Sequence, residues 1–152
     1  MPIEANNERF SEYIAKRMEA KLKAATKALE YCGNKGVAEM RQKGRYNDYT
    51  DRTGNLRSST GFAVVREGRF VAGSAFRKVK DGDKGTSEGK KRVTALSSQL
   101  LPNEMGLVIT AGMEYGQYLE KSGKRNVIGT TKKLVAKEAK ERLKKIGFTI
   151  SE

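Results

Sequence analysis

The sequence predicts an α+β fold in which a long N-terminal helix and a C-terminal helix pack with a small antiparallel β-sheet that carries a long flexible loop. Three patterns indicate this class. Apolar residues recur at helical spacing early in the chain, short alternating segments follow within residues 60–113, and a second helical pattern closes the sequence. A chain of 152 residues fits a single domain, 1–152, with a modest core.

The N-terminal helix is predicted over residues 6–43. Its apolar face is marked by residues three and four positions apart: Phe10, Ile14, Met18, Leu22, Ala25, Leu29 and Cys32. Gly33 and Gly36 each cost about 1 kcal/mol inside a helix, so we expect a bend there. Cys32 is the single cysteine and lies on the apolar face, which indicates a buried structural thiol rather than a disulfide partner.

The sheet is predicted from three short segments. Residues 60–66 and 69–76 are rich in β-forming side chains and flank the dipeptide Glu67 and Gly68, which indicates a β-hairpin. Residues 105–113 alternate between large apolar and small or polar side chains, as in a strand with one face on the core.

The closing helix is predicted over residues 130–146. Its apolar side is formed by Val135, Ala139, Leu143 and Ile146. Gly147 follows, and glycine is the residue that most often ends a helix. We expect this helix to pack on the sheet.

Residues 77–101 are rich in Gly, Lys and Ser and show no apolar period. Compact domains seldom carry so long a loop unless it binds something or stays disordered. We therefore predict a flexible basic docking loop, whose candidate contact residues are Arg77, Lys78, Lys80, Lys84, Lys90, Lys91 and Arg92.

The formal charge of +13 is unevenly distributed. Residues 121–145 hold ten Lys or Arg against two acids, whereas residues 93–120 hold no base and three acids. This asymmetry suits contact with nucleic acid, an acidic protein surface or the acidic face of a neighbouring copy. Candidate contacts to DNA or an acidic partner are Lys132, Lys133, Lys137, Lys140, Lys144 and Lys145. The alternative is a solvated face, in which Glu138 pairs with Arg142 and Glu141 with Lys145.

Several classes of protein are disfavoured by what the chain lacks. Without histidine and with a single cysteine, it cannot build a histidine-based triad or a thiolate metal cluster. Asp48 and Asp51, like Asp81 and Asp83, lie in loops where Asp commonly stabilises a turn. We expect no enzyme and no cofactor. No apolar run approaches the roughly 20 residues of a membrane span and no signal layout opens the chain, so we expect a soluble protein made in a cytoplasm.

Two short segments stand out. The first contains Asp51, Thr53, Gly54, Leu56, Arg57 and Ser59, and the second contains Tyr115, Tyr118, Leu119 and Glu120. Thr53 can cap a helical turn, Gly54 permits a tight reversal and Leu56 can fill the core. Arg57 offers donors for a carboxylate, and Glu120 is a candidate partner within one subunit or across an interface. The alternative is a simple loop-to-strand junction.

With these segments the chain resembles the small neck proteins of tailed bacteriophages, which act as head-to-tail connectors or tail-completion proteins. That family has a long N-terminal helix, an acid-Thr-Gly-x-Leu-Arg-x-Ser motif before its strands, a strand ending in Tyr-x-x-Tyr-hydrophobic-Glu, and a closing helix. The motifs match from Asp51 to Ser59 and from Tyr115 to Glu120, with Arg52 inserted between the acid and the Thr.

The resemblance implies a non-catalytic subunit that forms a ring of sixfold or twelvefold symmetry in the neck of the virion, assembled in the cytoplasm of the bacterial host. It implies as partners a portal or adaptor protein, a tail tube or tail terminator protein, and genomic DNA in the channel. A small basic protein that binds nucleic acid non-specifically is the second hypothesis, and a carboxylate enzyme is the third.

Overall fold

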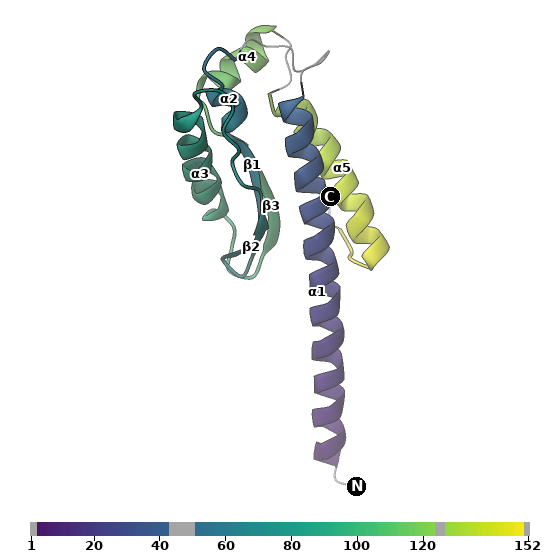
Figure 1. Cartoon of the computed structure of the whole chain (residues 1–152). Helices are drawn as coiled ribbons and strands as arrows, with labels where there is room; N and C mark the ends of the chain where they lie inside the picture. Colours follow the sequence, from purple (N-terminus) through teal and green to yellow (C-terminus); the bar gives the residue numbers. More distant parts are fainter. Residues whose placement is uncertain (1–2, 43–50, 124–126, 151–152) are drawn as a thin grey trace.

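The computed structural model describes residues 3–42, 51–123 and 127–150 and has the predicted α+β fold (Figure 1). The elements follow in the order α1 (Ile3–Arg41), α2 (Asn55–Ser58), β1 (Thr60–Arg66), β2 (Arg69–Gly73), α3 (Asp83–Ser97), β3 (Met105–Ala111), α4 (Tyr115–Gly123) and α5 (Gly129–Ile146). The long first helix, the antiparallel sheet and the closing helix are therefore confirmed.

The sheet has the strand order β2-β1-β3, and β1 runs antiparallel to both neighbours. Its pairing with β3 extends from Thr60 opposite Ala111 to Arg66 opposite Met105. The hairpin turn places Glu67 and Gly68 at positive φ, 53° and 71°, as a two-residue hairpin turn requires. The hairpin is thus confirmed, although β2 ends at Gly73 and not at residue 76.

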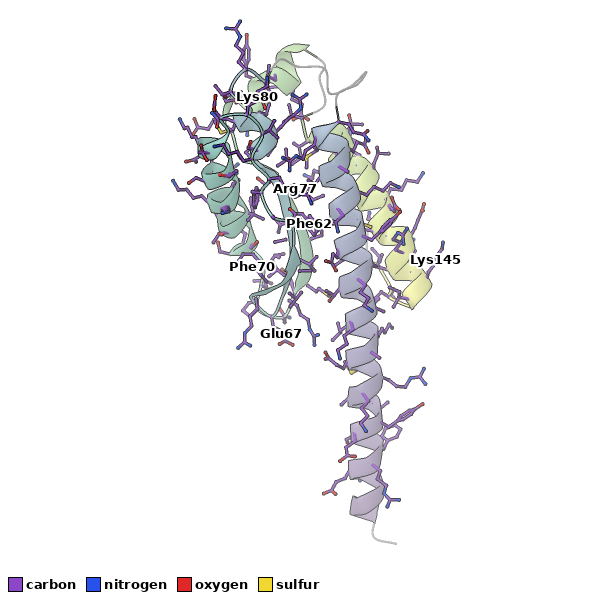
Figure 2. The ribbon with its side chains drawn as sticks, viewed as in Figure 1. Phe62, Glu67, Phe70, Arg77, Lys80 and Lys145 are labelled. Carbon is purple, nitrogen blue, oxygen red and sulfur yellow. The ribbon has the colours of Figure 1, made fainter. Side chains whose placement is uncertain are left out.

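The central strand is covered on both faces. Phe62 and Val64 point toward α1, and Ala63 and Val65 point toward α3, because successive side chains of a strand alternate between its faces. Figure 2 shows Phe62 between the sheet and α1. The molecule is therefore layered as α3, sheet and α1, and α5 lies beside α1 (Figure 1). Ala139 of α5 joins the apolar cluster formed by α1 and the sheet.

Helix α1 runs through Gly33 and Gly36 as one helix, and Figure 1 shows no kink along it, so the expected bend is wrong. The two glycines instead allow close packing. A Cβ atom at Gly33 would lie 2.3 Å from Cδ2 of Phe62, and one at Gly36 would lie 2.8 Å from Cγ2 of Val135. The sheet and α5 thus approach α1 more closely than any side chain at these positions would permit.

The predicted flexible loop over residues 77–101 is wrong, because residues 83–97 form helix α3. Its buried face consists of small residues and one valine four positions apart: Gly85, Gly89, Val93 and Ser97. A Cβ at Gly85 would lie 2.0 Å from the carbonyl oxygen of Asn55, and one at Gly89 would lie 2.7 Å from that of Ser59. The buried face of α3 therefore repeats at helical spacing but consists mainly of small residues, which allow the helix to pack closely against the backbone at Asn55 and Ser59. A search for large apolar side chains does not detect such a face.

The first part of α1 extends beyond the rest of the molecule (Figure 1). Every side chain of residues 7–20, which we call the N-terminal arm, is exposed. At the root of the arm, the guanidinium of Arg66 donates to both carboxylate oxygens of Glu19, at 3.2 and 2.9 Å. That hydrogen bonding lowers the pKa of Glu19. Within the described ranges, no helix combines the length and the apolar character of a membrane span.

The contact between Gly33 and Phe62 predicts an unusual response to alanine. Gly33→Ala should lower the free energy of unfolding by about 1–3 kcal/mol through overpacking, although the same change normally favours a helix by about 1 kcal/mol. The exposed neighbour Asn34 is the control, because Asn34→Ala should leave stability unchanged or slightly higher. Denaturant unfolding of both variants checks this. A Gly33→Ala variant more stable than the parent would refute the close contact.

Candidate assembly joint

The two segments singled out in the sequence meet at the end of the sheet where α2 and α4 lie, opposite to the N-terminal arm (Figure 1). We call this region the joint and define it by Asp51, Thr53, Leu56, Tyr115, Gly116 and Leu119. Residues about sixty positions apart thus form one structure.

Asp51 caps the short helix α2. Its Oδ2 accepts the backbone N–H of Arg57 at 2.9 Å, and its Oδ1 accepts that of Leu56 at 3.4 Å. The Oγ1 of Thr53 accepts the N–H of Asn55 at 3.3 Å, but the N-cap position of α2 is Gly54, so the capping carboxylate comes from Asp51 and not from a Thr53 N-cap as predicted. The first amides of α2 therefore find acceptors in the preceding turn, as helix N-termini require.

The turn that contains Gly54 packs closely against the segment around Val79, which precedes α3. Gly54 adopts a left-handed conformation, with φ 78°, and a Cβ there would lie 1.9 Å from the carbonyl oxygen of Val79. The Oγ of Ser58 accepts the N–H of Val79 at 2.8 Å, and the Oδ1 of Asn55 accepts that of Gly85 at 2.9 Å. Backbone contact fixes α2 against the start of α3.

Leu56 forms the apolar centre of the joint and is completely buried, as predicted. It packs with Val127, Met113 and Leu119, all of which come from the second half of the chain. A Cβ at Gly116 would lie 3.2 Å from Cδ1 of Leu56, so this glycine leaves room for the leucine. Leu56 therefore connects α2 to α4 and to the residues before α5.

Tyr115 connects the two segments on the polar side of the joint. Tyr115 is 41% exposed, and the partial burial of its ring raises the pKa of the phenol. The charge of Asp51 adds to the rise, while hydrogen bonding with the Thr53 side chain and the Leu56 backbone acts in the opposite direction. Tyr115 and Asp51 line a hollow of about 430 Å³ that also includes Lys84.

Glu120, a residue of α4, accepts hydrogen bonds from the backbone at the start of α5. Its Oε1 accepts the N–H of Ile128 at 2.9 Å and also that of Gly129. Arg57 is buried, and none of the ion pairs among the described residues joins it to Glu120. The structure thus places the Glu120 carboxylate on a helix terminus, where a negative charge is favourable, and not on Arg57 of the same subunit.

The remaining motif residues lie on either side of the joint. The Oγ of Ser59 donates to the carbonyl oxygen of Leu56 at 2.7 Å and is buried at the entry to β1. Tyr118 is 70% exposed and lies on the outer surface of α4. The joint therefore includes most of the predicted residues but not the Tyr118 ring.

The basic residues assigned to the docking loop lie on α3 and on the turn before it. Lys78 pairs with Asp83 at 2.7 Å and Lys91 with Glu88 at 3.2 Å. Lys80 donates to the carbonyl oxygen of Asp51 at 3.0 Å. The others are placed as follows: Arg77 accepts a hydrogen bond from Arg41 through its carbonyl oxygen, Lys84 lines the hollow, and Lys90 and Arg92 are exposed. This basic segment is thus a folded part of the domain.

The six candidate lysines of α5 are all exposed, and Figure 2 shows Lys145 directed away from the body. Of the two expected pairs, that between Glu138 and Arg142 is formed at 3.2 Å, and Glu138 also pairs with Lys35 of α1 at 2.7 Å. These contacts lower the pKa of Glu138, with the hydrogen bond from Lys35 as the largest cause. The lysine face is therefore solvated and available to a partner.

The sequence reasoning missed Gly85, Gly116 and Val127, which the structure shows to be essential to the contacts of α2. Small residues spaced four apart would have indicated the α3 face. No group of acidic or cysteine side chains in the described part of the chain is arranged to hold a metal ion. Comparison of the chain with protein-family models, with curated proteins and with solved structures finds no match.

The cap provided by Glu120 predicts a graded response to mutation. Glu120→Ala should lower the free energy of unfolding by about 1–2 kcal/mol, because two amides lose their acceptor. Glu120→Gln keeps a carbonyl acceptor and should lose less. Glu141→Ala on the exposed face of α5 is the matched control and should have little effect. Equal losses for Ala and Gln in thermal or denaturant unfolding would show that the cap is not the source of the stability.

Proposed function

We propose that this protein is a structural component of the head-tail neck of a tailed bacteriophage, acting in tail completion or as a head-to-tail connector. In this proposal it assembles as a ring of sixfold or twelvefold symmetry between portal and tail. It has no catalytic role.

The observation that carries the proposal is how the motif residues are used. The carboxylates of Asp51 and Glu120 accept backbone amides at the starts of α2 and α5, and Leu56 fills the space between them. A carboxylate engaged in this way holds backbone in place and is not presented to a substrate. The motifs that resemble the neck family thus have the form expected of a subunit whose function is its shape.

The surface charge supports the same proposal. The lysine face of α5 is exposed along the helix, which suits contact with channel DNA or with an acidic neighbouring ring. The partners we propose are the portal or adaptor protein on one side and the tail tube or terminator protein on the other. The basic α3 surface adds Lys90 and Arg92 as exposed candidates for such contacts.

The ring is tested by the mass and shape of the purified protein. We expect light scattering to give six or twelve copies at micromolar concentration or above, and negative-stain images to show closed rings. Arg57→Ala, next to the caps of α2, should lower the ring fraction or the melting temperature, whereas the exposed Arg52→Ala should change neither. A protein that remains monomeric at every concentration, alone and with portal or tail proteins, would contradict the proposal.

A small non-specific nucleic-acid-binding protein is the second candidate, and the exposed lysines of α5 favour it. It predicts tight binding of free duplex DNA of any sequence, with an affinity that falls steeply with salt. Each phosphate contact contributes a slope of about 0.9 in a plot of log affinity against log salt. Replacing Lys133, Lys137 and Lys144 by Gln should then reduce the slope by about 3. Binding that is weak and unaffected by the triple variant would remove this candidate.

A further inference from the structure

Some of the exposed lysines of α5 form a single line of positive charge. They are spaced four, three and four positions apart, so they share one side of the helix. We call them the lysine ridge: Lys133, Lys137, Lys140 and Lys144. The buried Val135 lies on the opposite side of α5, so the ridge points straight out from the body. Lys132 and Lys145 lie off this line, one on each side of it.

The ridge is not neutralised by its own chain. Among the described residues, none of its lysines takes part in an ion pair. Glu138 is turned toward α1 and pairs with Lys35 and Arg142 instead, and Glu141, which borders the ridge, forms no ion pair in the described part of the chain. Like charges one turn apart on a helix repel each other. The ridge is therefore a surface that gains by meeting a negatively charged partner.

A second copy of the chain is a poor partner for the ridge. The acidic stretch, residues 93–120, contains three acids and no base. Two of these acids are already engaged, because Glu104 accepts the N–H of Leu101 at 2.8 Å and Glu120 accepts that of Ile128 at 2.9 Å. The stretch thus offers the carboxylate of Glu114 against four ammonium groups. The N-terminal arm holds three acids against three bases and is no better suited.

Duplex DNA matches the ridge in charge density. At 1.5 Å per residue, the ridge extends over about 16 Å of α5. Duplex DNA carries one negative charge per about 1.7 Å of its axis. An extended acidic peptide carries at most one charge per about 3.3 Å, and half of its side chains point away from a surface on which it lies. DNA therefore brings more negative charge to a straight line of lysines than such a peptide does.

The chemistry of the side chains indicates how tightly DNA is held. All four members of the ridge are lysines and none is arginine. An arginine guanidinium grips a phosphate through two parallel hydrogen bonds, whereas a lysine ammonium acts as a point charge on a flexible stem. The ridge can therefore neutralise phosphates without fixing the position of the DNA.

We propose that the lysine ridge binds the phosphate backbone of duplex DNA loosely and without reading its sequence, so that the DNA can slide along the subunit. This contact rests on the proposed function, because it identifies DNA as the partner of the α5 surface in the neck. In a ring, several ridges share the same duplex, so each of them can be weak.

Matched charge removal tests which surface binds. Binding of the full chain to a fluorescent duplex is measured by anisotropy at low salt. Replacing all four lysines of the ridge by Gln should weaken binding about tenfold or more. The control removes the same charge from exposed positions of α1, through Arg9→Gln, Lys16→Gln, Lys23→Gln and Lys27→Gln. It should weaken binding less than about threefold, because these bases lie off the ridge. Equal losses would show that only net charge matters and would overturn the proposal.

An arginine ridge tests the loose contact. Replacing the same four lysines by Arg keeps the charge and adds bidentate donors, so the affinity should be equal or higher and dissociation from DNA about threefold slower or more. Stopped-flow chase with unlabelled duplex measures the rate. An unchanged rate, or a loss of binding like that of the Gln variant, would overturn the proposal. Polyglutamate that competes as well as DNA at equal charge would point to an acidic protein partner and would also overturn it.

The outcomes separate the DNA contact from the ring. Rings whose DNA binding depends on the ridge support both proposals. Rings that bind no DNA, or bind it equally well without the ridge, overturn the contact and leave the neck proposal standing. Ridge-dependent binding by a chain that stays monomeric supports the contact and counts against the ring.

Discussion

The structure depends on the burial of β1 on both of its faces. Phe62 and Val64 require one apolar cover, and Ala63 and Val65 require another, so the strand is stable only with a helix on each side. Helix α1 provides the first cover and α3 the second. Gly33 lets α1 approach Phe62 of β1, and Gly89 lets α3 approach Phe76 and the carbonyl oxygen of Ser59, the residue before β1. These positions are therefore constrained by packing and not by helix propensity.

The joint connects the covered strand β1 to α4 and α5. α2 leads directly into β1, and its caps and Leu56 fix the direction in which the strand begins. β3 pairs with β1 and then leads to α4, whose Glu120 sets the start of α5. α5 in turn packs on α1, which covers β1. Each half of the chain is thereby held in position by the other.

The predictions of α1, α5 and β3, which the structure confirms, rested on the spacing of large apolar side chains. The spacing of residues such as Leu29 and Leu143 predicted the two long helices, and the alternation around Ile109 predicted β3. Helix α3 was missed because its periodic face is made of two glycines and a serine with a single valine, and the burial of such small residues depends on a neighbouring backbone that the sequence does not display. The function of Glu120 was missed for a similar reason, since its partners are backbone amides and not a charged side chain.

The central claim is that α3 is a folded cover of β1, and amide hydrogen exchange of the full chain tests it most directly. Amides in the second half of α3, residues 89–97, should be protected to nearly the same degree as those of β1, because the strand cannot stay buried when its cover opens. Exchange of residues 89–97 at the rate of an unstructured loop, while β1 remains protected, would contradict the account.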